Sequence, residues 1–399
     1  MRKSARRLIN SDLWRIVVAK KILFIAPNAS SKCAFSAFTL LMDFFVWMKA
    51  NTDIPFNILA VRGGDLEPEF KKIAPTFVLL RDGRRAGLLN SILSRLELMW
   101  KVLLLRFKFT RSNTALIYSM TMSNGYALKL LSSIGCPVIC HIQELEYVIE
   151  YLGGLEGLKR YINQYIACCA AGKNCLVNSY AIPESKIETI DQCLAFPRLK
   201  IQHDRNYIRG LLGIPRDAVI VYASGTTEWR KAPDIFIQLA RIVNGISKDP
   251  VYFIWIGGED RGPVYDRLIH DVKKIGLEER VKFLGAKSDP YDYYSACDIF
   301  ILVSREDMFP MVVLEAAYIG KPILCFDRAG GAKEFVEDDA GFVVPYLDVE
   351  AMSAKIIDLV NSPQLRGRLG GRAREKVIER HDVAMSAPKI LGVIKKFLT

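Results

Sequence analysis

The sequence contains no run of about 18 uninterrupted apolar residues, the minimum for a helix that crosses a bilayer. Its basic N-terminus, MRKSARRLINSDLW, also lacks an apolar core of signal-peptide length. Low-complexity segments and internal repeats of solenoid period are missing as well. These absences predict a globular cytoplasmic protein, either soluble or peripheral on the inner face of a membrane.

Motifs typical of several other protein classes are also absent. The nine cysteines have no paired spacing, and Cys136 and Cys140 have only His141 close by, which disfavours a disulfide framework and a zinc site. No predicted strand is followed by Gly-x-Gly-x-x-Gly, which disfavours a nicotinamide-dependent oxidoreductase. No nucleic-acid-binding motif occurs. We therefore expect a reducing compartment and no nucleic-acid partner.

The composition is that of a folded chain, with 51% hydrophobic and 25% charged residues. A length of 399 residues suits two domains of about 150 to 200 residues each. Positive charge is localised, because residues 1–111 contain 20 Lys and Arg against 8 Asp and Glu and so carry the whole net charge of +12. This basic part indicates an anionic partner, such as lipid headgroups or a phosphorylated acceptor.

Short apolar strands alternate with helical patterns along both halves of the chain. Strands are expected at residues 21–27, 56–62, 76–80, 115–120, 137–142, 165–169, 218–224, 251–257, 281–285, 299–304 and 322–327. Most of them are followed by a helical segment, and residues 191–206, which contain Pro197, have the irregular pattern of a linker. Strand followed by helix, repeated in this way, predicts two doubly wound α/β domains.

The segment from Ile299 to Val344 carries the clearest candidate site. A buried strand, Ile299 to Ser304, precedes an acidic loop, and a helix then begins at about Met311. Loops at the carboxyl ends of parallel strands bind ligands, and unpaired N–H groups at the start of the next helix suit a phosphate.

Two carboxylates are placed to serve this loop. Asp307 lies in the loop and Glu315 about two turns into the helix, so both can accept hydrogen bonds from sugar hydroxyls. The alternatives are that Asp307 caps the helix and that Glu315 is a solvated or salt-bridged helix residue.

Other strand ends add further candidates. Arg230 and Lys231, in the loop that begins at Gly225, can neutralise a pyrophosphate or can be a solvated basic loop. Gly257 and Gly258 end a strand and allow a ligand to approach the backbone closely. His141 ends a strand of the first half, where it can hydrogen-bond a sugar or phosphate or be a buried structural residue.

The segment from Arg84 to Arg111 has two interpretations. It is densely apolar and interrupted by Arg95, Lys101, Arg106 and Lys108. One interpretation is a helix buried against the sheet, with its long cations reaching solvent. The other is an interfacial membrane helix, which the basic flanks and Trp100 favour.

Three strings resemble the retaining glycosyltransferases of family 4. The string SREDMFPMVVLEAAYIGKPI resembles that family's signature, with Asp307 at the position of the first Glu and Glu306 beside it; the matching positions are Phe309, Pro310, Leu314, Glu315, Ala316, Gly320 and Pro322. PVICHIQELE resembles the strand that ends in His-x-His-Glu-Leu-Glu. The loop after Gly225 resembles Gly-Arg-Leu, three residues, Lys-Gly, with Lys231 on the phosphate-binding Lys and with Thr226 and Ala232 as departures.

The resemblance implies a GT-B fold, in which two Rossmann-like domains face each other across a cleft. Residues 1–195 would form the acceptor-side domain, 196–382 the nucleotide-sugar-binding domain and 383–399 a helix crossing back to the first domain. It implies retaining transfer of a sugar from a UDP- or GDP-sugar to a glycan or lipid-linked acceptor of surface polysaccharide or glycolipid synthesis. No cofactor is expected, and no metal, since the chain lacks any Asp-x-Asp.

The same resemblance implies roles for the candidate residues. Glu315 would hold the ribose, Asp307 the donor sugar, and His141 the sugar from the other domain. Contacts to the rest of the nucleotide sugar would come from Arg230, Lys231, Gly225, Gly257, Gly258, Glu306, Phe309, Pro310 and Met311. A sugar-nucleotide epimerase and a non-catalytic sugar-nucleotide-binding protein remain alternatives on the same fold.

Overall fold

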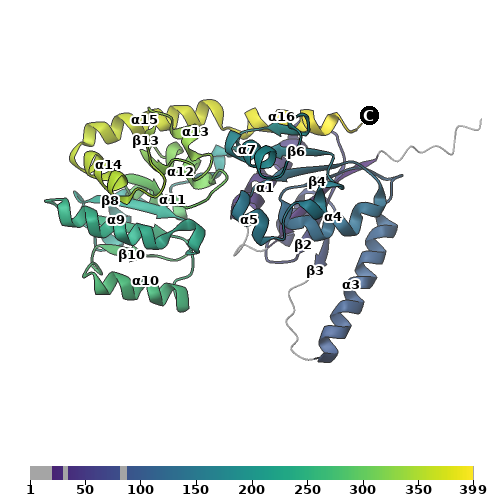
Figure 1. Ribbon diagram of the computed structural model, residues 1–399, viewed down its shortest axis with the longest axis horizontal. Helices are drawn as coiled ribbons and strands as arrows, with labels where there is room; N and C mark the ends of the chain where they lie inside the picture. The colour runs from purple at the N-terminus through teal and green to yellow at the C-terminus, as the bar shows by residue number, and fades with distance from the viewer. Residues whose placement is uncertain (1–19, 30–34, 81–87, 399) are drawn as a thin grey trace, which may run out of the picture.

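The protein folds around two separate parallel sheets, in a computed structural model that describes residues 20–29, 35–80 and 88–398. Figure 1 shows the two bodies side by side, each with helices on both faces of its sheet. Every pair of neighbouring strands is parallel. The doubly wound α/β architecture predicted from the sequence is thus confirmed.

The first domain contains a seven-stranded sheet of order β3-β2-β1-β4-β5-β6-β7. Its strands are β1 (Lys21–Asn28), β2 (Phe56–Arg62), β3 (Thr76–Leu80), β4 (Thr114–Ser119), β5 (Val138–Ile142), β6 (Gln164–Ala167) and β7 (Ile187–Thr189). Its helices are α1 (Phe35–Asn51), α2 (Glu67–Ile73), α3 (Leu88–Lys108), α4 (Gly125–Leu131), α5 (Glu146–Tyr151), α6 (Glu156–Lys159) and α7 (Ala170–Asn178). The central strand β1 is buried, and its Phe24 ring packs 4.9 Å from that of Phe45 on α1. Such two-sided burial is why residues 22–26 of this strand are all apolar.

The second domain contains a six-stranded sheet of order β10-β9-β8-β11-β12-β13. Its strands are β8 (Val219–Ser224), β9 (Val251–Ile256), β10 (Val281–Phe283), β11 (Ile299–Leu302), β12 (Ile323–Phe326) and β13 (Gly341–Val344). Its helices are α8 (Arg205–Leu211), α9 (Pro233–Ile246), α10 (Pro263–Lys274), α11 (Pro290–Ala296), α12 (Met311–Tyr318), α13 (Ala332–Val336), α14 (Val349–Asn361) and α15 (Pro363–Arg380). The strand order reverses between β8 and β11, and this switch point is where open α/β sheets bind ligands.

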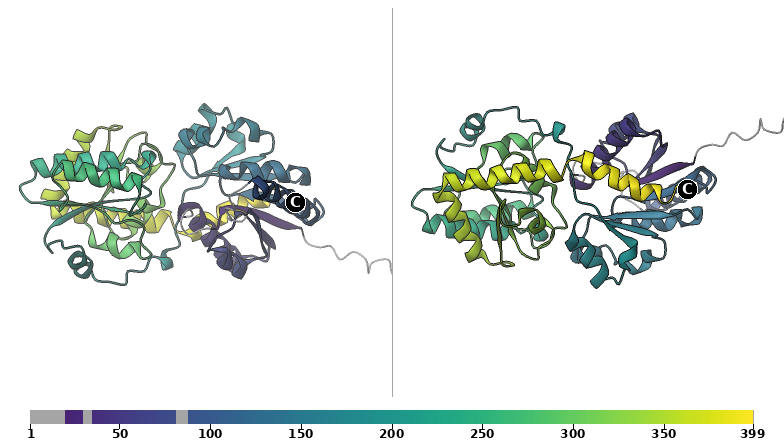
Figure 2. Two further views of the ribbon diagram at one scale, coloured as in Figure 1. Left: turned by 90° about the horizontal axis from the view of Figure 1, so that it is seen from below. Right: turned by 90° about the horizontal axis from the view of Figure 1, so that it is seen from above.

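The chain passes between the domains twice, and the two crossings are hydrogen-bonded to each other. The Leu194 N–H donates to the His381 carbonyl at 2.8 Å, and the Val383 N–H donates to the Leu194 carbonyl at 2.9 Å. After the second crossing, α16 (Val383–Lys395) packs against α1 of the first domain, as both views in Figure 2 show. The first crossing lies in the predicted linker, residues 191–206, and the second lies at the start of the predicted returning helix, residues 383–399. The exact domain boundaries stay a prediction.

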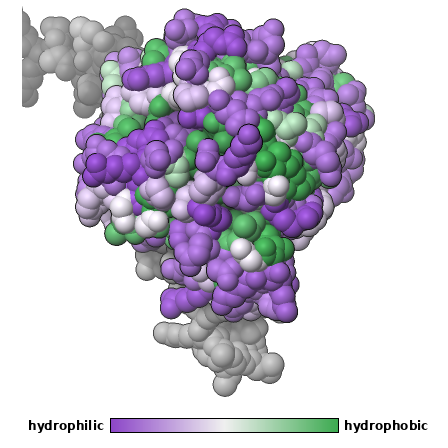
Figure 3. Space-filling view, turned by 90° about the vertical axis from the view of Figure 1, so that its left-hand side faces the viewer, coloured by the Kyte–Doolittle hydropathy of each residue, from purple (hydrophilic) through white to green (hydrophobic). Residues whose placement is uncertain are grey.

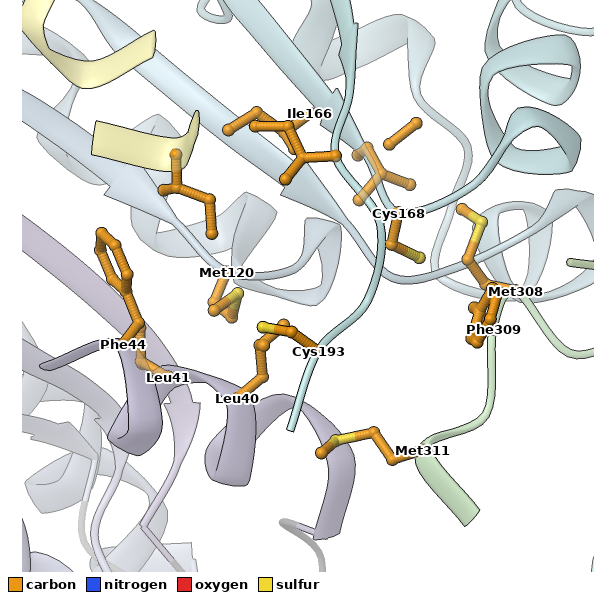
Figure 4. Close-up of a cluster of buried hydrophobic side chains, with 14 of the residues drawn as sticks. Leu40, Leu41, Phe44, Met120, Ile166, Cys168, Cys193, Met308, Phe309 and Met311 are labelled. Atoms are coloured by element: carbon orange, nitrogen blue, oxygen red, sulfur yellow. The ribbon is translucent and has the colours of Figure 1, made fainter. Parts of the chain in front are cut away.

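The loop after β11 also joins the domains. Met308, Phe309 and Met311 belong to one buried cluster with Leu40 of α1 and Cys193 of the linker, shown in Figure 4. Close approach depends on Gly172 in α7, because a Cβ there would lie 2.7 Å from the Met308 Cε. The candidate site therefore sits where the second domain touches the first.

The exposure of helix α3 differs in part from what one interpretation of its sequence predicted, a helix buried against the sheet. Leu105 is buried and Leu98 and Val102 are partly buried, but the large apolar side chains of Met99, Trp100, Leu103, Leu104 and Phe107 are exposed, so that interpretation holds for one side of residues 98–108 and is wrong for the other. The side chains of residues 81–97, Arg84 and Arg95 among them, lie outside what the structure describes, as do the basic leader and the loop at 30–33. Within the described chain, no helix combines the length and apolarity that a membrane span requires.

Candidate functional site

The loops after β8 and β11 meet at the switch point of the second sheet. The Arg305 N–H donates to the Arg230 carbonyl at 2.8 Å, so the acidic and basic loops predicted from the sequence are adjacent. On the other side, the Asp307 N–H donates to the Ala329 carbonyl at 2.7 Å in the loop after β12. Gly330 is required there, because any Cβ would collide with the Asp307 carbonyl.

Asp307 is the centre of a buried ion cluster, with 8% of its surface exposed. The Lys231 ammonium contacts its Oδ2, the Arg230 guanidinium lies 3.4 Å from its Oδ1, and the Ser304 hydroxyl donates to Oδ2 at 3.3 Å. Burial raises the pKa of Asp307, but Lys231 and Arg230 outweigh it, and the pKa is lowered overall. The structure thus unites three of the predicted residues as a carboxylate held between two cations.

Arg230 is held from several sides. Its guanidinium donates to the Glu306 carbonyl at 3.0 Å and to the Glu228 carboxylate at 2.9 Å. Burial lowers the pKa of Arg230, but Asp307 and Glu228 outweigh it and raise the pKa above the usual range. Arg230 and Lys231 are therefore a fixed pair of cations at the carboxyl edge of the sheet, and the alternative of a fully solvated basic loop is wrong.

Gly225, Gly257 and Gly258 bring the loops after β8 and β9 together beside these cations. A Cβ on Gly257 would lie 2.6 Å from the Gly225 carbonyl oxygen, and one on Gly258 would lie 2.7 Å from the Thr227 side chain. Their φ angles of 152°, 113° and 74° are also in the region that favours glycine. The glycines allow tight loop packing and leave Lys231 stretched over Gly225, whose Cβ would meet it at 3.4 Å.

Glu315 lies in a second set of contacts, separate from the Asp307 cluster. Its Oε1 accepts a hydrogen bond from the Tyr291 hydroxyl at 3.2 Å. Burial raises the pKa of Glu315, and the nearby Arg198 opposes that rise. Arg198, from the linker, forms an ion pair at 3.2 Å with Asp43 of α1. Burial raises the pKa of Asp43 to about 6.

Arg198 and Asp43 were not predicted as site residues. They come from the linker and the first helix, so no local sequence pattern connects them with Glu315. Only the folded chain brings an arginine beside that carboxylate.

The start of α12 offers backbone N–H groups. Pro310 occupies the N-cap position and no side chain caps the helix, so the alternative that Asp307 is the cap is wrong. Phe309 and Met311 are buried, and the Phe309 ring lies 5.6 Å from that of His381. These side chains anchor the loop. In the first turn the Val313 N–H already donates to the Pro310 carbonyl at 3.1 Å, which leaves the N–H groups of Met311 and Val312 to face an anion.

His141 lies inside the first domain. It is 2% exposed, and its Nδ1 is 2.9 Å from the Tyr118 hydroxyl. Burial lowers the pKa of His141 to about 3, so the imidazole is neutral. Its Nε2 is buried and has no partner among the described residues. Among the described residues, no hydrogen bond or ion pair joins the His141 side chain to the Asp307 cluster.

Two glutamates of the second domain bind helix starts of the first. Glu306 Oε2 accepts the Tyr147 N–H of α5 at 3.1 Å, and Glu334 accepts the N–H groups of Ala170 and Ala171 of α7 at 2.8 Å each. Burial raises the pKa of Glu306, and its Oε1 has no partner within the described chain. Sequence reasoning named Glu306 as a site residue but missed Glu334, whose partners are about 160 residues away.

One histidine and two aspartates between the linker and α11 are of the residue types that bind cations. His203, Asp289 and Asp292 bring ligand atoms within 4.8 Å of one another. However, Asp292 already accepts the N–H groups of Gln202 and His203 at 2.6 and 3.2 Å, and the His203 ring at 2.7 Å. This contact set fastens the linker to α11 and does not need an ion.

The chain is similar in sequence to known glycosyltransferases. Residues 204–376 match the family model described as glycosyl transferases group 1. N-acetyl-alpha-D-glucosaminyl L-malate synthase of Bacillus anthracis is 25% identical over 200 residues, 50% of each chain. D-inositol 3-phosphate glycosyltransferase of Saccharomonospora viridis is 27% identical over 208 residues, 50% of this chain and 48% of the relative. The chain thus matches about half the length of these curated relatives.

Similarity to solved structures extends over nearly the whole chain. The Anabaena protein HepE in complex with UDP-glucose aligns with a TM-score of 0.76 at 20% identity, covering 94% of this chain and 99% of the other. Sucrose-phosphate synthase from Thermosynechococcus elongatus aligns with a TM-score of 0.72 at 16% identity, covering 94% and 98%. These likenesses show the GT-B fold, and within the second domain residues 204–376 match the glycosyl transferases group 1 model.

Proposed function

We propose that the protein is a metal-independent, retaining glycosyltransferase that moves a sugar from a nucleoside-diphosphate sugar, a UDP- or GDP-sugar, to a glycan or lipid-linked acceptor. The observation that carries the proposal is the pair Arg230 and Lys231, fixed beside an uncapped helix start at the switch point of the second sheet. Two cations and free N–H groups are what a diphosphate needs.

The diphosphate would bind by replacing an internal charge partner. In the unliganded arrangement Asp307 neutralises both cations. Phosphate oxygens near Lys231 would take over part of that neutralisation, which frees the Asp307 carboxylate to accept hydrogen bonds from the donor sugar. Glu315, held by Tyr291, would accept the ribose hydroxyls.

The proposed reaction is a transfer on one face of the sugar. The bond between the anomeric carbon and the β-phosphate oxygen breaks, and the acceptor hydroxyl oxygen forms the new bond on the same face. The acceptor proton passes to the departing phosphate oxygen, so no enzyme nucleophile is needed. Arg230 and Lys231 stabilise the charge that develops on the nucleoside diphosphate.

Relatives support the choice of substrates. The HepE structures contain UDP, UDP with glucose, and UDP-glucose, and one relative is the poly(ribitol-phosphate) alpha-N-acetylglucosaminyltransferase of Staphylococcus aureus. We extend this to a donor of the UDP- or GDP-sugar class and an acceptor of surface polysaccharide or glycolipid synthesis. The uncommitted His141 Nε2 keeps that residue as a proposed contact from the first domain.

Thermal unfolding with UDP, GDP, ADP and their sugar conjugates, combined with an assay for released nucleotide, tests the proposal. A nucleotide at 100 times its dissociation constant stabilises the fold by about 2.7 kcal/mol. We expect one nucleotide series to stabilise the protein and its sugar conjugate to be consumed with an acceptor. Consumption without an acceptor that yields a changed sugar would instead indicate the epimerase, and stabilisation without turnover by any acceptor would indicate a binding protein.

Substitutions then test the assigned residues. Lys231→Ala and Glu315→Ala should each lower turnover by about a hundredfold or more, since each removes an interaction with the nucleotide. Lys355→Ala and Glu375→Ala, on the outer helices α14 and α15, are the matched controls and should keep wild-type turnover. Wild-type rates in both site variants would refute the assignment.

A further inference from the structure

Helix α3 presents a continuous apolar surface to solvent. Met99, Trp100, Leu103, Leu104 and Phe107 are 68, 63, 44, 50 and 75% exposed, and we name these five residues the α3 apolar face. Figures 1 and 2 show α3 on the side of the first domain that is remote from the second domain. Each of these side chains would lose apolar contact with water if the face were covered.

The opposite side of the same helix is packed. Leu105 is buried, and Leu98 and Val102 are partly buried against the first domain's core. At about 100° per residue the five residues of the α3 apolar face span an arc of about 140°, and the packed residues lie outside it. The helix is therefore fixed in rotation with its apolar face turned outward.

Cations border the α3 apolar face on both sides. Arg106 lies next to Met99 around the helix, and Lys101 and Lys108 lie next to Leu104. Residues 98–111 contain four Lys and Arg and no Asp or Glu. An apolar stripe with cationic borders and a tryptophan matches the interface of a membrane that contains anionic lipids.

Other exposed apolar residues are not arranged in this way. Figure 3 shows the end of the second domain, where hydrophilic residues predominate and hydrophobic ones form small separate patches. Leu211 on α8 and Ile246 on α9 are 63 and 62% exposed. Both match Trp100 in exposure but stand at the ends of two different helices.

We propose that the α3 apolar face inserts into the headgroup region of a bilayer that contains anionic lipid, with Arg106 and Lys108 at its borders. Within the protein, the Arg106 Nε donates to the Leu130 carbonyl at 3.4 Å and the Lys108 ammonium lies 4.1 Å from the Phe77 ring centroid, so both cations are held beside the first domain at the edges of this face. The inference adds to the proposed function a surface that would hold the enzyme beside a lipid-linked acceptor. It depends on neither the donor nor the acceptor, so it can be tested without turnover.

Sedimentation with vesicles is the first test. We expect the wild-type protein to bind vesicles of phosphatidylcholine with about a third phosphatidylglycerol, and to bind less as salt screens the cations. Trp100→Ser with Phe107→Ser should weaken partitioning about tenfold or more, because burial of either ring contributes at least about 1.5 kcal/mol. The control pair Leu211→Ser with Ile246→Ser should bind as the wild type does.

Two further measurements separate the alternatives. Brominated lipid should quench tryptophan fluorescence in the wild type and much less in Trp100→Phe, which still binds. Absence of wild-type binding at low salt, or equal binding by the double-serine variant, would overturn the inference. Light scattering that finds a wild-type dimer, converted to monomer by the same variant, would assign the face to a second copy of this chain and overturn it as well.

Discussion

At the scale of single residues, the central fact is that Asp307 and the two cations compensate one another. A buried carboxylate without a cation is costly, and so is a buried cation without a carboxylate. The sequence could predict all three residues, because they lie in loops after apolar strands. Their mutual contact could not be predicted, because it joins side chains 76 residues apart.

A double-mutant cycle measures this compensation. Lys231→Met should lower the free energy of unfolding by about 1 to 3 kcal/mol, because Asp307 then keeps only Arg230 as a close cation. Lys231→Met with Asp307→Asn should recover much of that loss, because the buried charge is removed. Urea unfolding of the wild type, both single variants and the double variant gives the coupling, and simple additivity of the two single effects would contradict it.

Asp43 gives a pH dependence of stability. Its pKa is raised by burial from 3.8 in the unfolded chain to about 6 in the folded protein, so the folded state binds its proton more tightly. The stability that this group contributes is complete below about pH 4 and is lost as the pH rises through 6.

Asp43→Asn should remove this titration. The difference in unfolding free energy, wild type minus variant, should therefore fall between about pH 4 and 6 and stay level above that range. Urea unfolding at a series of pH values provides the measurement, and Asp53→Asn in the loop before β2 is a matched control. Parallel profiles for the wild type and Asp43→Asn would contradict a raised pKa.

At the scale of elements, local sequence patterns predicted strands and helices well because the signals themselves are local. Strands β2 and β3 have the predicted bounds, since apolar runs there stop at Gly63 and a charged segment. The pattern of α3 could not decide between burial and exposure, because apolar residues occur all around that helix. Which side is covered depends on β3 and α4, which the sequence of α3 does not contain.

The start of α12 in the candidate site also shows what a local sequence pattern can and cannot predict. Pro310 correctly predicted where α12 begins. Sequence reasoning also allowed Asp307 to cap that helix, yet in the structure the carboxylate turns to Lys231 and Arg230. A charged partner from another loop therefore outweighed a local backbone donor.

At the scale of the whole molecule, polar contacts join the two domains in addition to the buried cluster around Met308 and the packing of α16 on α1. Glu334→Ala removes the acceptor for two N–H groups of α7. We expect this substitution to lower the stability of the closed arrangement by about 1 kcal/mol and to increase the radius of gyration in X-ray scattering. Glu350→Ala, in the first turn of α14, keeps all contacts between the domains and is the control. An unchanged scattering profile together with unchanged stability would show that Glu334 does not hold the domains.

The paired crossings at Leu194 and Asp382 limit how these domains can move. The two connecting segments are hydrogen-bonded side by side, so they would resist a twisting motion between the domains and permit a bending motion. Opening would swing the loops after β8 and β11 away from α5 and α7 along one arc. The domains would return to the same alignment at every closure, so the paired crossings would fix how the two sides of the candidate site face each other.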